Sequence, residues 1–225
     1  MKPISIAIDG PSGAGKSSIA RKTAERFGFL YIDTGAIYRT VGLAAYRRGI
    51  TPQDTSAVIA MLPELHIELR HGGDGIQRMY LDGEDVSETI RLPEISMYAS
   101  GVSAIPEVRA YLMEMQRSFA RTQNVIMDGR DIGTVVLPDA GLKIFLTASS
   151  EARARRRQLE LENKGQHVPF EEVLREMEQR DKNDTSRAAA PLRAAEDAVR
   201  LDTTELDFAG SCAAVEALIR ERFSL

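Results

Sequence analysis

A short glycine-rich segment near the amino terminus combines residue types that bind phosphate. Residues 10–17 read Gly-Pro-Ser-Gly-Ala-Gly-Lys-Ser, which fits the pattern G-x-x-x-x-G-K-[ST] in full. Glycines let such a backbone curl so that several N–H groups converge on one anion. Lys16 can then reach the β- and γ-phosphates of a nucleotide, and the Ser17 hydroxyl can bind Mg²⁺. The sequence therefore predicts a site for ATP and Mg²⁺ built from Gly10, Pro11, Ser12, Gly13, Ala14, Gly15, Lys16, Ser17 and Ser18.

Several arginines stand where a second phosphate would need them. When ATP gives its phosphate to another phosphate, the acceptor oxygen is already an anion and needs no general base. Such a site must instead supply distributed positive charge and exclude water. Arg39 lies one turn into a predicted helix, and Arg130 directly follows a predicted strand. Arg180, Asp184 and Arg187 have the spacing i, i+4, i+7, which predicts one shared face if the helix continues that far.

A second group of arginines crowds one predicted helix. Arg153, Arg155, Arg156 and Arg157 precede a break at Gly165, and a movable lid over a phosphate-transfer site would have this composition. The alternative is a solvated surface, which is the better interpretation for any single member. Of the 29 basic residues 23 are arginine, whose rigid fork suits phosphate, although a genome rich in arginine codons would produce the same bias.

The elements that must position these residues follow an alternating pattern. Strands are predicted at residues 4–9, 30–32, 124–128, 142–146 and 199–203, and those at 4–9, 124–128 and 142–146 are expected to be buried. Helices are predicted at about 16–27, 36–48, from Pro106 onward, 151–163, from Pro169 onward and 208–223. Strands that alternate with helices indicate a parallel sheet covered on both faces. The glycine-rich segment then joins a strand to a helix, which disfavours an ordinary turn, and Arg130 lies at the carboxyl end of the sheet, where ligands bind.

Residues 62–92 have a different character. Alternating runs at 65–70 and 76–81 flank a turn, and Asp82-Gly83 is a hairpin signal, so we expect a small antiparallel sheet. The predicted fold is α/β: a P-loop three-layer α/β/α arrangement with a five-stranded parallel sheet, this insert and a helical lid. We expect one unit, with a core from 1–35, 120–150 and 188–225, a region at 36–119 that carries the insert, and the lid with its adjoining helix at 151–187.

Composition excludes several classes of protein. A net charge of −4 argues against a protein that coats nucleic acid. No run of 18 apolar residues could span a membrane, and the amino terminus lacks a signal-peptide layout. The single cysteine, Cys212, excludes an intrachain disulfide, and His66, His71 and His167 lack a zinc-binding spacing. We therefore expect a cytoplasmic monomer that acts on small molecules, with neither nucleic acid nor membrane as a partner.

Four segments resemble one family through nearly the whole chain. They are residues 8–17, 33–39 (Asp-Thr-Gly-Ala-Ile-Tyr-Arg), 128–136 (Asp-Gly-Arg-Asp-Ile-Gly-Thr-Val-Val) and 180–192, which begins Arg-Asp and ends Arg-Ala-Ala-Ala-Pro-Leu. The first segment occurs throughout a large superfamily, whereas the last three together are specific to a small group of proteins. In them the chain closely resembles bacterial cytidylate kinases, which are nucleoside monophosphate kinases. The insert at 62–92 also looks like the enlarged monophosphate-binding insert of that family, so region 36–119 is expected to bind the monophosphate.

The resemblance implies transfer of phosphate from ATP to CMP or dCMP. It implies that the acceptor phosphate is gripped by Arg39, Arg130 and Arg187, which join Lys16 as the expected catalytic residues. It implies that the ribose is held by Thr34, Arg180 and Asp184, and that cytosine is read by Ser100, Arg109 and Asp131. Arg153 and Arg157 are the lid arginines expected to contact ATP, although the match does not decide among that group. Thr34 stands where relatives carry Ser, which keeps the hydroxyl but restricts its rotamer.

Other interpretations remain open on the sequence alone. A GTPase is disfavoured because the nearest fragment to N-K-x-D, residues 163–166, lacks the Asp. A P-loop kinase for another small acceptor, such as another nucleoside monophosphate or shikimate, is the nearest rival. A non-enzymatic nucleotide switch would need neither Arg130 nor the 180/184/187 group. Asp131 has a second interpretation too, in which it only orients Arg130 through a salt bridge.

Overall fold

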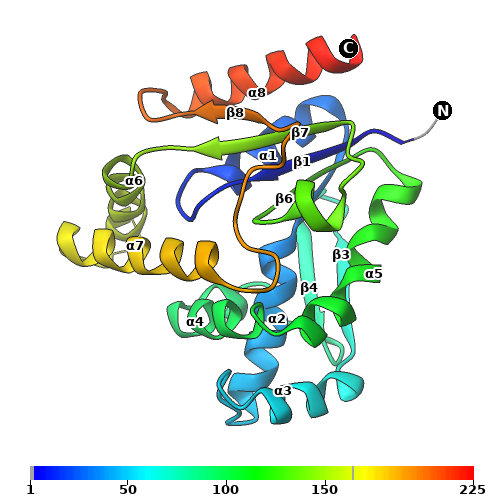
Figure 1. Cartoon of the computed structure of the whole chain (residues 1–225), viewed down its shortest axis with the longest axis vertical. Coiled ribbons are helices and arrows are strands. Elements are labelled where there is room, and N and C mark those ends of the chain that lie inside the picture. Colours follow the sequence, from blue (N-terminus) through cyan, green and yellow to red (C-terminus); the bar gives the residue numbers. More distant parts are fainter. Residues whose placement is uncertain (1–2, 164) are drawn as a thin grey trace. The chain divides into compact units, whose positions relative to one another are not determined.

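The computed structural model describes residues 3–163 and 165–225, and the chain divides into two compact units. The first unit comprises Met1–Tyr31 and Ala120–Leu225, and the second comprises Ile32–Phe119 (Figure 1). The boundary after Tyr31 falls within a strand of the first unit's sheet, so the chain passes from that strand directly into the second unit. Among the described residues, no helix is both long and apolar enough to cross a bilayer.

A five-stranded sheet organises the first unit. Its strands are β1 (Ser5–Asp9), β2 (Leu30–Asp33), β6 (Val125–Gly129), β7 (Leu142–Thr147) and β8 (Val199–Asp202), in the order β2-β6-β1-β7-β8. β1 runs parallel to both β6 and β7, and β7 runs parallel to β8. The predicted five-stranded parallel sheet is therefore confirmed. Asp9, the last residue of β1, pairs with Gly129 on one side and Phe145 on the other, so the carboxyl ends of the three central strands lie level.

Two helices cover one face of this sheet. α1 (Lys16–Phe27) buries Ile19, Ala20 and Ala24, and it packs beside α8 (Phe208–Phe223). Both helices share a core with the inward side chains of β1 and β7, among them Ile6 and Ile144. α1 has the predicted bounds. It ends at Gly28, whose left-handed backbone (φ 65°) lets its N–H reach the last carbonyls of the helix.

The two helices predicted as lid and adjoining helix form a small apolar cluster of their own. α6 (Ser150–Asn163) and α7 (Phe170–Ser186) bury Ala154, Leu161, Val173 and Met177 against one another. The predicted helix face that would include Arg187 is wrong, because α7 ends at Ser186 and Arg187 is extended. The chain turns back after α7, and the Leu192 N–H donates to the Asp184 carbonyl that a continuing helix would have used.

The second unit holds the predicted insert. β3 (Ile67–His71), β4 (Gln77–Leu81) and β5 (Glu84–Asp85) form a three-stranded antiparallel sheet, which confirms the insert. Asp82 and Gly83 join β4 to β5 with positive φ values of 52° and 86°, as a tight hairpin turn requires.

Helices complete the second unit. α2 (Thr34–Arg47) starts two residues before the predicted Ala36, because the Asp33 carboxylate caps it by accepting from the Ala36 N–H. α5 (Pro106–Thr122) starts at Pro106 as predicted, and it buries Val108, Leu112 and Gln116. Three-residue 3₁₀ turns lie at Leu62–Glu64 and Thr89–Arg91. Two further helices were not predicted: α3 (Thr55–Met61) and α4 (Pro93–Val102).

Candidate active site

The glycine-rich segment folds as a tight loop between β1 and α1. Gly10 (φ 152°) and Gly13 (φ 72°) adopt backbone conformations that side chains rarely tolerate. A Cβ on Gly10 would lie 1.9 Å from the Leu146 carbonyl oxygen, and one on Gly13 would lie 2.2 Å from the Met177 methyl. The loop therefore packs tightly against β7 and α7. It delivers the amino terminus of α1, with its unpaired N–H groups and positive dipole end, to the same place, which is suited to binding an anion.

Lys16, the first residue of α1, is the buried cation of this loop. Its side chain is almost fully buried, and its ammonium donates to the Pro11 carbonyl at 2.7 Å. Burial, and after it the charge of Arg130, lower the pKa of Lys16 from 10.5 to about 7. The cation is therefore poorly compensated without an anion, and a phosphate beside it would restore its charge.

This lowered pKa predicts that the protein takes up a proton when it binds ATP. At about pH 8, a lysine with a pKa near 7 is mostly neutral, and a bound phosphate would return it to its charged form. We expect an uptake of roughly half a proton to one proton per ATP. Calorimetry in two buffers of different ionisation enthalpy measures it. A matched Lys22→Ala variant should retain the uptake, since Lys22 is exposed on the same helix and pairs with Glu25. Binding without proton uptake would contradict the account of Lys16.

A hydroxyl and a carboxylate stand together at the start of α1. The Ser17 hydroxyl donates to one oxygen of Asp128 at 2.9 Å, and the Tyr31 hydroxyl donates to the other at 2.9 Å. Asp128 is the fourth residue of β6 and is buried. Hydroxyl and carboxylate oxygens are the ligands that Mg²⁺ prefers, usually together with substrate phosphates and water. Ser17 was predicted as a metal ligand and Asp128 was not. The available signal was an acidic residue at the end of a buried strand.

The arginines of the first unit meet carboxylates beside this loop. The Arg130 Nε donates to Asp184 at 2.8 Å, and its Nη1 donates to the Gly129 carbonyl. Burial alone would raise the pKa of the Asp184 carboxyl. Arg130 outweighs that effect, with help from Arg180 and Arg187, and holds the pKa below its usual value. Arg130, Arg180 and Asp184 also influence the charge of Lys16, so the structure brings these four side chains together.

Asp131 pairs with a different arginine from the one expected. Its carboxylate accepts from the Arg187 Nη2 at 3.4 Å, and both side chains are buried. The Arg187 Nε also donates to the Ala190 carbonyl at 2.7 Å, within the turn that follows α7. The suggestion that Asp131 orients Arg130 through a salt bridge is therefore wrong, because Arg130 is held by Asp184 and the partner of Asp131 is Arg187.

The remaining predicted substrate residues lie in the second unit. Asp33 caps α2 and also accepts from Arg39 at 2.9 Å, so this arginine is fixed one turn above the buried Thr34. The buried Arg109 guanidinium donates to the Ser103 carbonyl at 3.2 Å and lies 5.4 Å from the centre of the Tyr38 ring. Ser100, on α4, is partly buried, and its carbonyl accepts from the Ser103 hydroxyl.

The two lid arginines predicted to bind ATP have different surroundings. Arg153 is buried and bridges α6 to the phosphate loop: its Nη1 donates to the Ser12 carbonyl at 2.8 Å and lies 2.7 Å from the Asp181 carboxylate. Its Nε donates to the Ala148 carbonyl at 3.0 Å. Arg157 is more exposed and pairs with Glu160, a residue of its own helix, at 2.8 Å. Arg153 thus stabilises the phosphate loop through its bonds to Ser12 and Asp181, whereas Arg157 does not contact the loop in the described structure.

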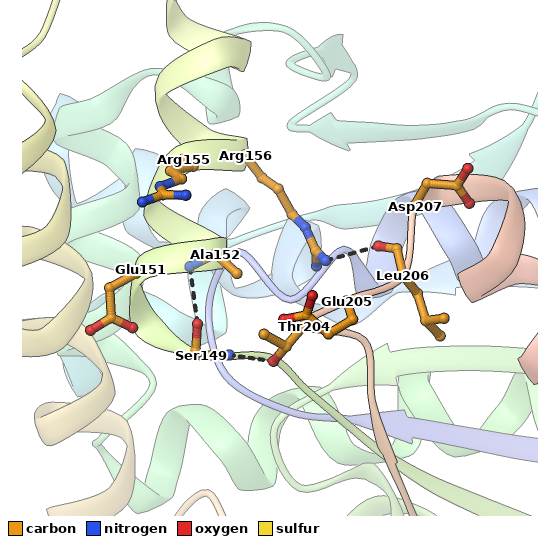
Figure 2. A pocket seen from close by; sticks show the side chains of 9 residues that line it. All are labelled: Ser149, Glu151, Ala152, Arg155, Arg156, Thr204, Glu205, Leu206 and Asp207. Carbon is orange, nitrogen blue, oxygen red and sulfur yellow. Dashed lines mark hydrogen bonds between the residues drawn. The ribbon is translucent and has the colours of Figure 1, made fainter.

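A polar pocket of about 460 Å³ opens beside the start of α6. Figure 2 shows Ser149, Arg155 and Arg156 on the α6 side and residues 204–207 on the other. Arg156 holds this second side in place by donating to the Leu206 carbonyl, and the Ser149 N–H donates to the Thr204 hydroxyl (Figure 2). Arg156 also donates to the Thr203 carbonyl. Residues 204–207 were not predicted as site residues, because they lie in a short loop that carries no motif of its own.

Comparisons with known proteins agree with one another over almost the whole chain. A family model described as Cytidylate kinase matches residues 6–221. The cytidylate kinase of Caldicellulosiruptor bescii is 54% identical over 206 residues, which cover 92% of this chain and 91% of that protein. The cytidylate kinase of Geobacter sulfurreducens is 48% identical over 217 residues, which cover 96% and 93%. A crystal structure of an uncharacterized protein from Eubacterium ventriosum covers 99% of both chains with a TM-score of 0.54 and 13% identity, a likeness in fold alone.

Proposed function

The chain belongs to the cytidylate kinase family, and from that premise we propose that it moves the γ-phosphate of ATP to CMP or dCMP. The products are ADP and CDP or dCDP. The observation that carries the proposal is the cluster in the first unit, where the buried Lys16 of the phosphate loop is influenced by Arg130, Arg180 and Asp184. The donor and acceptor phosphates repel each other, so transfer requires cations on both sides of the phosphate that moves.

The donor side of the reaction is assigned to the phosphate loop and the pocket beside α6. We assign the triphosphate to the loop N–H groups and Lys16. Ser17 and Asp128 would hold Mg²⁺, which would supply positive charge to offset that of the phosphates. The 460 Å³ pocket is within the size range of ligand sites and is linked to the loop through Arg153 of the same helix. It would take the adenine, with Arg155 available to stack on the ring.

The acceptor side is assigned to arginines that carboxylates hold in place. Arg130 and Arg187 are oriented by Asp184 and Asp131, and Arg39 is oriented by Asp33. The CMP phosphate needs no general base, so their role is to bring it in line with the γ-phosphate and to stabilise the charge that develops between them.

The remaining proposals concern the ribose and cytosine contacts and the roles of two regions of the chain. The ribose contacts are proposed to come from Thr34, Arg180 and Asp184, and the cytosine contacts from Ser100, Arg109 and Asp131. Residues 36–119 are proposed as the monophosphate-binding region and residues 151–187 as the lid and its adjoining helix. We further propose that the enzyme works as a cytoplasmic monomer.

A panel of acceptors tests the proposed function. ADP formation from MgATP is followed in a coupled assay with CMP, dCMP, UMP, AMP, GMP and shikimate, each at several concentrations. We expect CMP or dCMP to give the highest kcat/KM. A higher value for AMP, GMP or shikimate would overturn the proposal, and so would equal ADP formation with and without any acceptor.

The proposed cytosine contact of Asp131 predicts a change in base choice. Cytosine presents an amino donor where uracil places a carbonyl acceptor, so a carboxylate at that point favours CMP over UMP by roughly ten- to a hundredfold. Asp131→Ala should therefore reduce kcat/KM far more for CMP than for UMP and narrow the ratio between them. Asp139→Ala is the matched control, because Asp139 is exposed and lies in the same segment between β6 and β7. If Asp131 only positions Arg187, both substrates will lose equally and the ratio will not change.

A further inference from the structure

One buried carboxylate next to the phosphate loop has no part in the mechanism described so far. Asp9 is the last residue of β1, and its side chain is almost fully buried. One of its oxygens accepts from the Ile132 N–H at 2.8 Å, and the other accepts from the Gly133 N–H at 2.7 Å. These bonds join residues 123 and 124 positions apart in the sequence.

The main chain of Asp9 is a fixed point in the first unit. It is paired with Gly129 of β6 on one side and with Phe145 of β7 on the other. The next residue, Gly10, lies so close to the Leu146 carbonyl that no Cβ would fit. Asp9 therefore cannot shift without moving the centre of the sheet and the first residue of the phosphate loop.

The two N–H groups that Asp9 binds belong to the segment that carries Arg130 and Asp131. Ile132 and Gly133 begin a π-helical turn, η3 (Ile132–Val136), and the first N–H groups of any helix lack partners within it. Asp131 precedes this turn, and its own side chain does not cap it. The carboxylate of Asp9 does so instead, and it thereby fixes the peptide planes that follow Asp131 and Ile132.

The charge on Asp9 is not there to stabilise the fold. Burial is the largest influence and raises the pKa of Asp9 from 3.8 to about 6, although the two N–H bonds act against it. A carboxyl with a higher pKa in the folded than in the unfolded state favours folding when protonated, so its contribution to stability falls as the pH rises from about 4 to 6. At neutral pH the protein keeps an ionised carboxylate at a cost in stability, which is typical of functional sites.

We propose that Asp9 is a positioning residue for the phosphate acceptor: its carboxylate holds the turn at 130–133 so that Arg130 and Asp131 face the acceptor. The inference rests on the proposed function, because it takes CMP as the acceptor. Asp9 touches neither nucleotide in this account. It acts through the two backbone N–H groups and ties the segment that binds CMP to the strand from which the phosphate loop starts.

Asp9→Asn tests the inference. The amide has nearly the same shape, but only its oxygen can accept, and its NH₂ group would face the second backbone N–H. We expect the CMP dissociation constant, measured by calorimetry, to rise about tenfold or more, with a matching rise in the KM for CMP. The KM for ATP should stay within about twofold, and circular dichroism should show that the variant is folded even though one backbone N–H loses its acceptor. CMP binding and turnover by the unaltered enzyme are measured first, so failure of the proposed function is seen separately.

A second variant and a control keep the test decisive. A Cβ on Gly133 would lie 3.1 Å from the Lys143 Cδ and 3.4 Å from the Asp9 carboxylate, so Gly133→Ala crowds the contact between Asp9 and the turn and should weaken CMP binding selectively too. Glu216→Gln neutralises an equally buried carboxylate, on α8, and should leave CMP affinity unchanged. Unchanged CMP affinity in Asp9→Asn, or equal losses for ATP and CMP, would overturn the inference. If that variant does not fold, unchanged CMP affinity in Gly133→Ala would overturn it.

Discussion

Replacement of Lys16 by alanine is expected to reduce kcat by about a hundredfold or more, which corresponds to about 2.7 kcal/mol or more of lost transition-state stabilisation. The ammonium is buried in the phosphate loop and donates to the Pro11 carbonyl of that loop. Negative charge on the transferred group must be offset throughout the reaction, and a cation in a site shielded from water does this more strongly than one in bulk solvent. Steady-state kinetics with saturating CMP measures the loss.

The fold should survive this change, because a buried ammonium with a pKa near 7 contributes little to stability. Circular dichroism and thermal melting verify this. Lys22→Ala removes an exposed lysine of the same helix and should leave kcat within about twofold. Turnover near that of the unaltered enzyme in Lys16→Ala would mean that the loop is not the site of transfer.

Replacement of Arg130 by lysine should reduce kcat/KM for CMP about tenfold or more, or about 1.4 kcal/mol or above. The guanidinium donates from its Nε to Asp184 and from its Nη1 to the Gly129 carbonyl, and these two bonds in different directions fix its plane. An ammonium is a point charge that cannot reproduce this geometry together with a two-pronged contact to phosphate. Because lysine keeps the positive charge, the loss in kcat/KM measures what the geometry of the guanidinium contributes.

The partner of Arg130 provides the companion experiment. Asp184→Asn should show a loss of the same kind, and the double variant should lose less than the sum of the single losses, because the two side chains act as one group. Arg220→Lys on α8 is the control for a conservative change at an arginine paired with a glutamate. An unchanged kcat/KM in Arg130→Lys would assign that arginine a purely structural role.

Local sequence signals were enough to predict the sheet and the phosphate loop. Most strands of the first unit are short apolar runs bounded by a turn or a helix, whereas β8 alternates apolar and charged residues and is largely exposed. Gly28 marks the end of α1 because its left-handed conformation closes the helix there. The hairpin at Asp82-Gly83 was predictable for the same reason, since both residues take positive φ. These features depend on neighbouring residues alone.

Features that depend on distant residues could not be predicted in this way. Arg187 leaves the helix because the Leu192 N–H bonds the Asp184 carbonyl. A rule based on helical spacing cannot predict that this distant N–H takes the carbonyl that the next helical turn would have used. The partners of Arg130 and Asp131 depend on how α7 packs beside β6. Asp9 had appeared only as the end of a strand, and its role emerges from two bonds across more than a hundred residues.

Transfer of a labelled phosphate tests the central claim most directly. The enzyme is incubated with CMP and MgATP that carries ³²P in the γ position, and the products are separated after a single turnover. The account predicts that the label appears in CDP, at its β-phosphate, with no labelled protein, because the acceptor is itself a phosphate held in line with the donor. Label released as inorganic phosphate while CMP remains unlabelled, or label bound covalently to the enzyme, would contradict direct transfer to CMP.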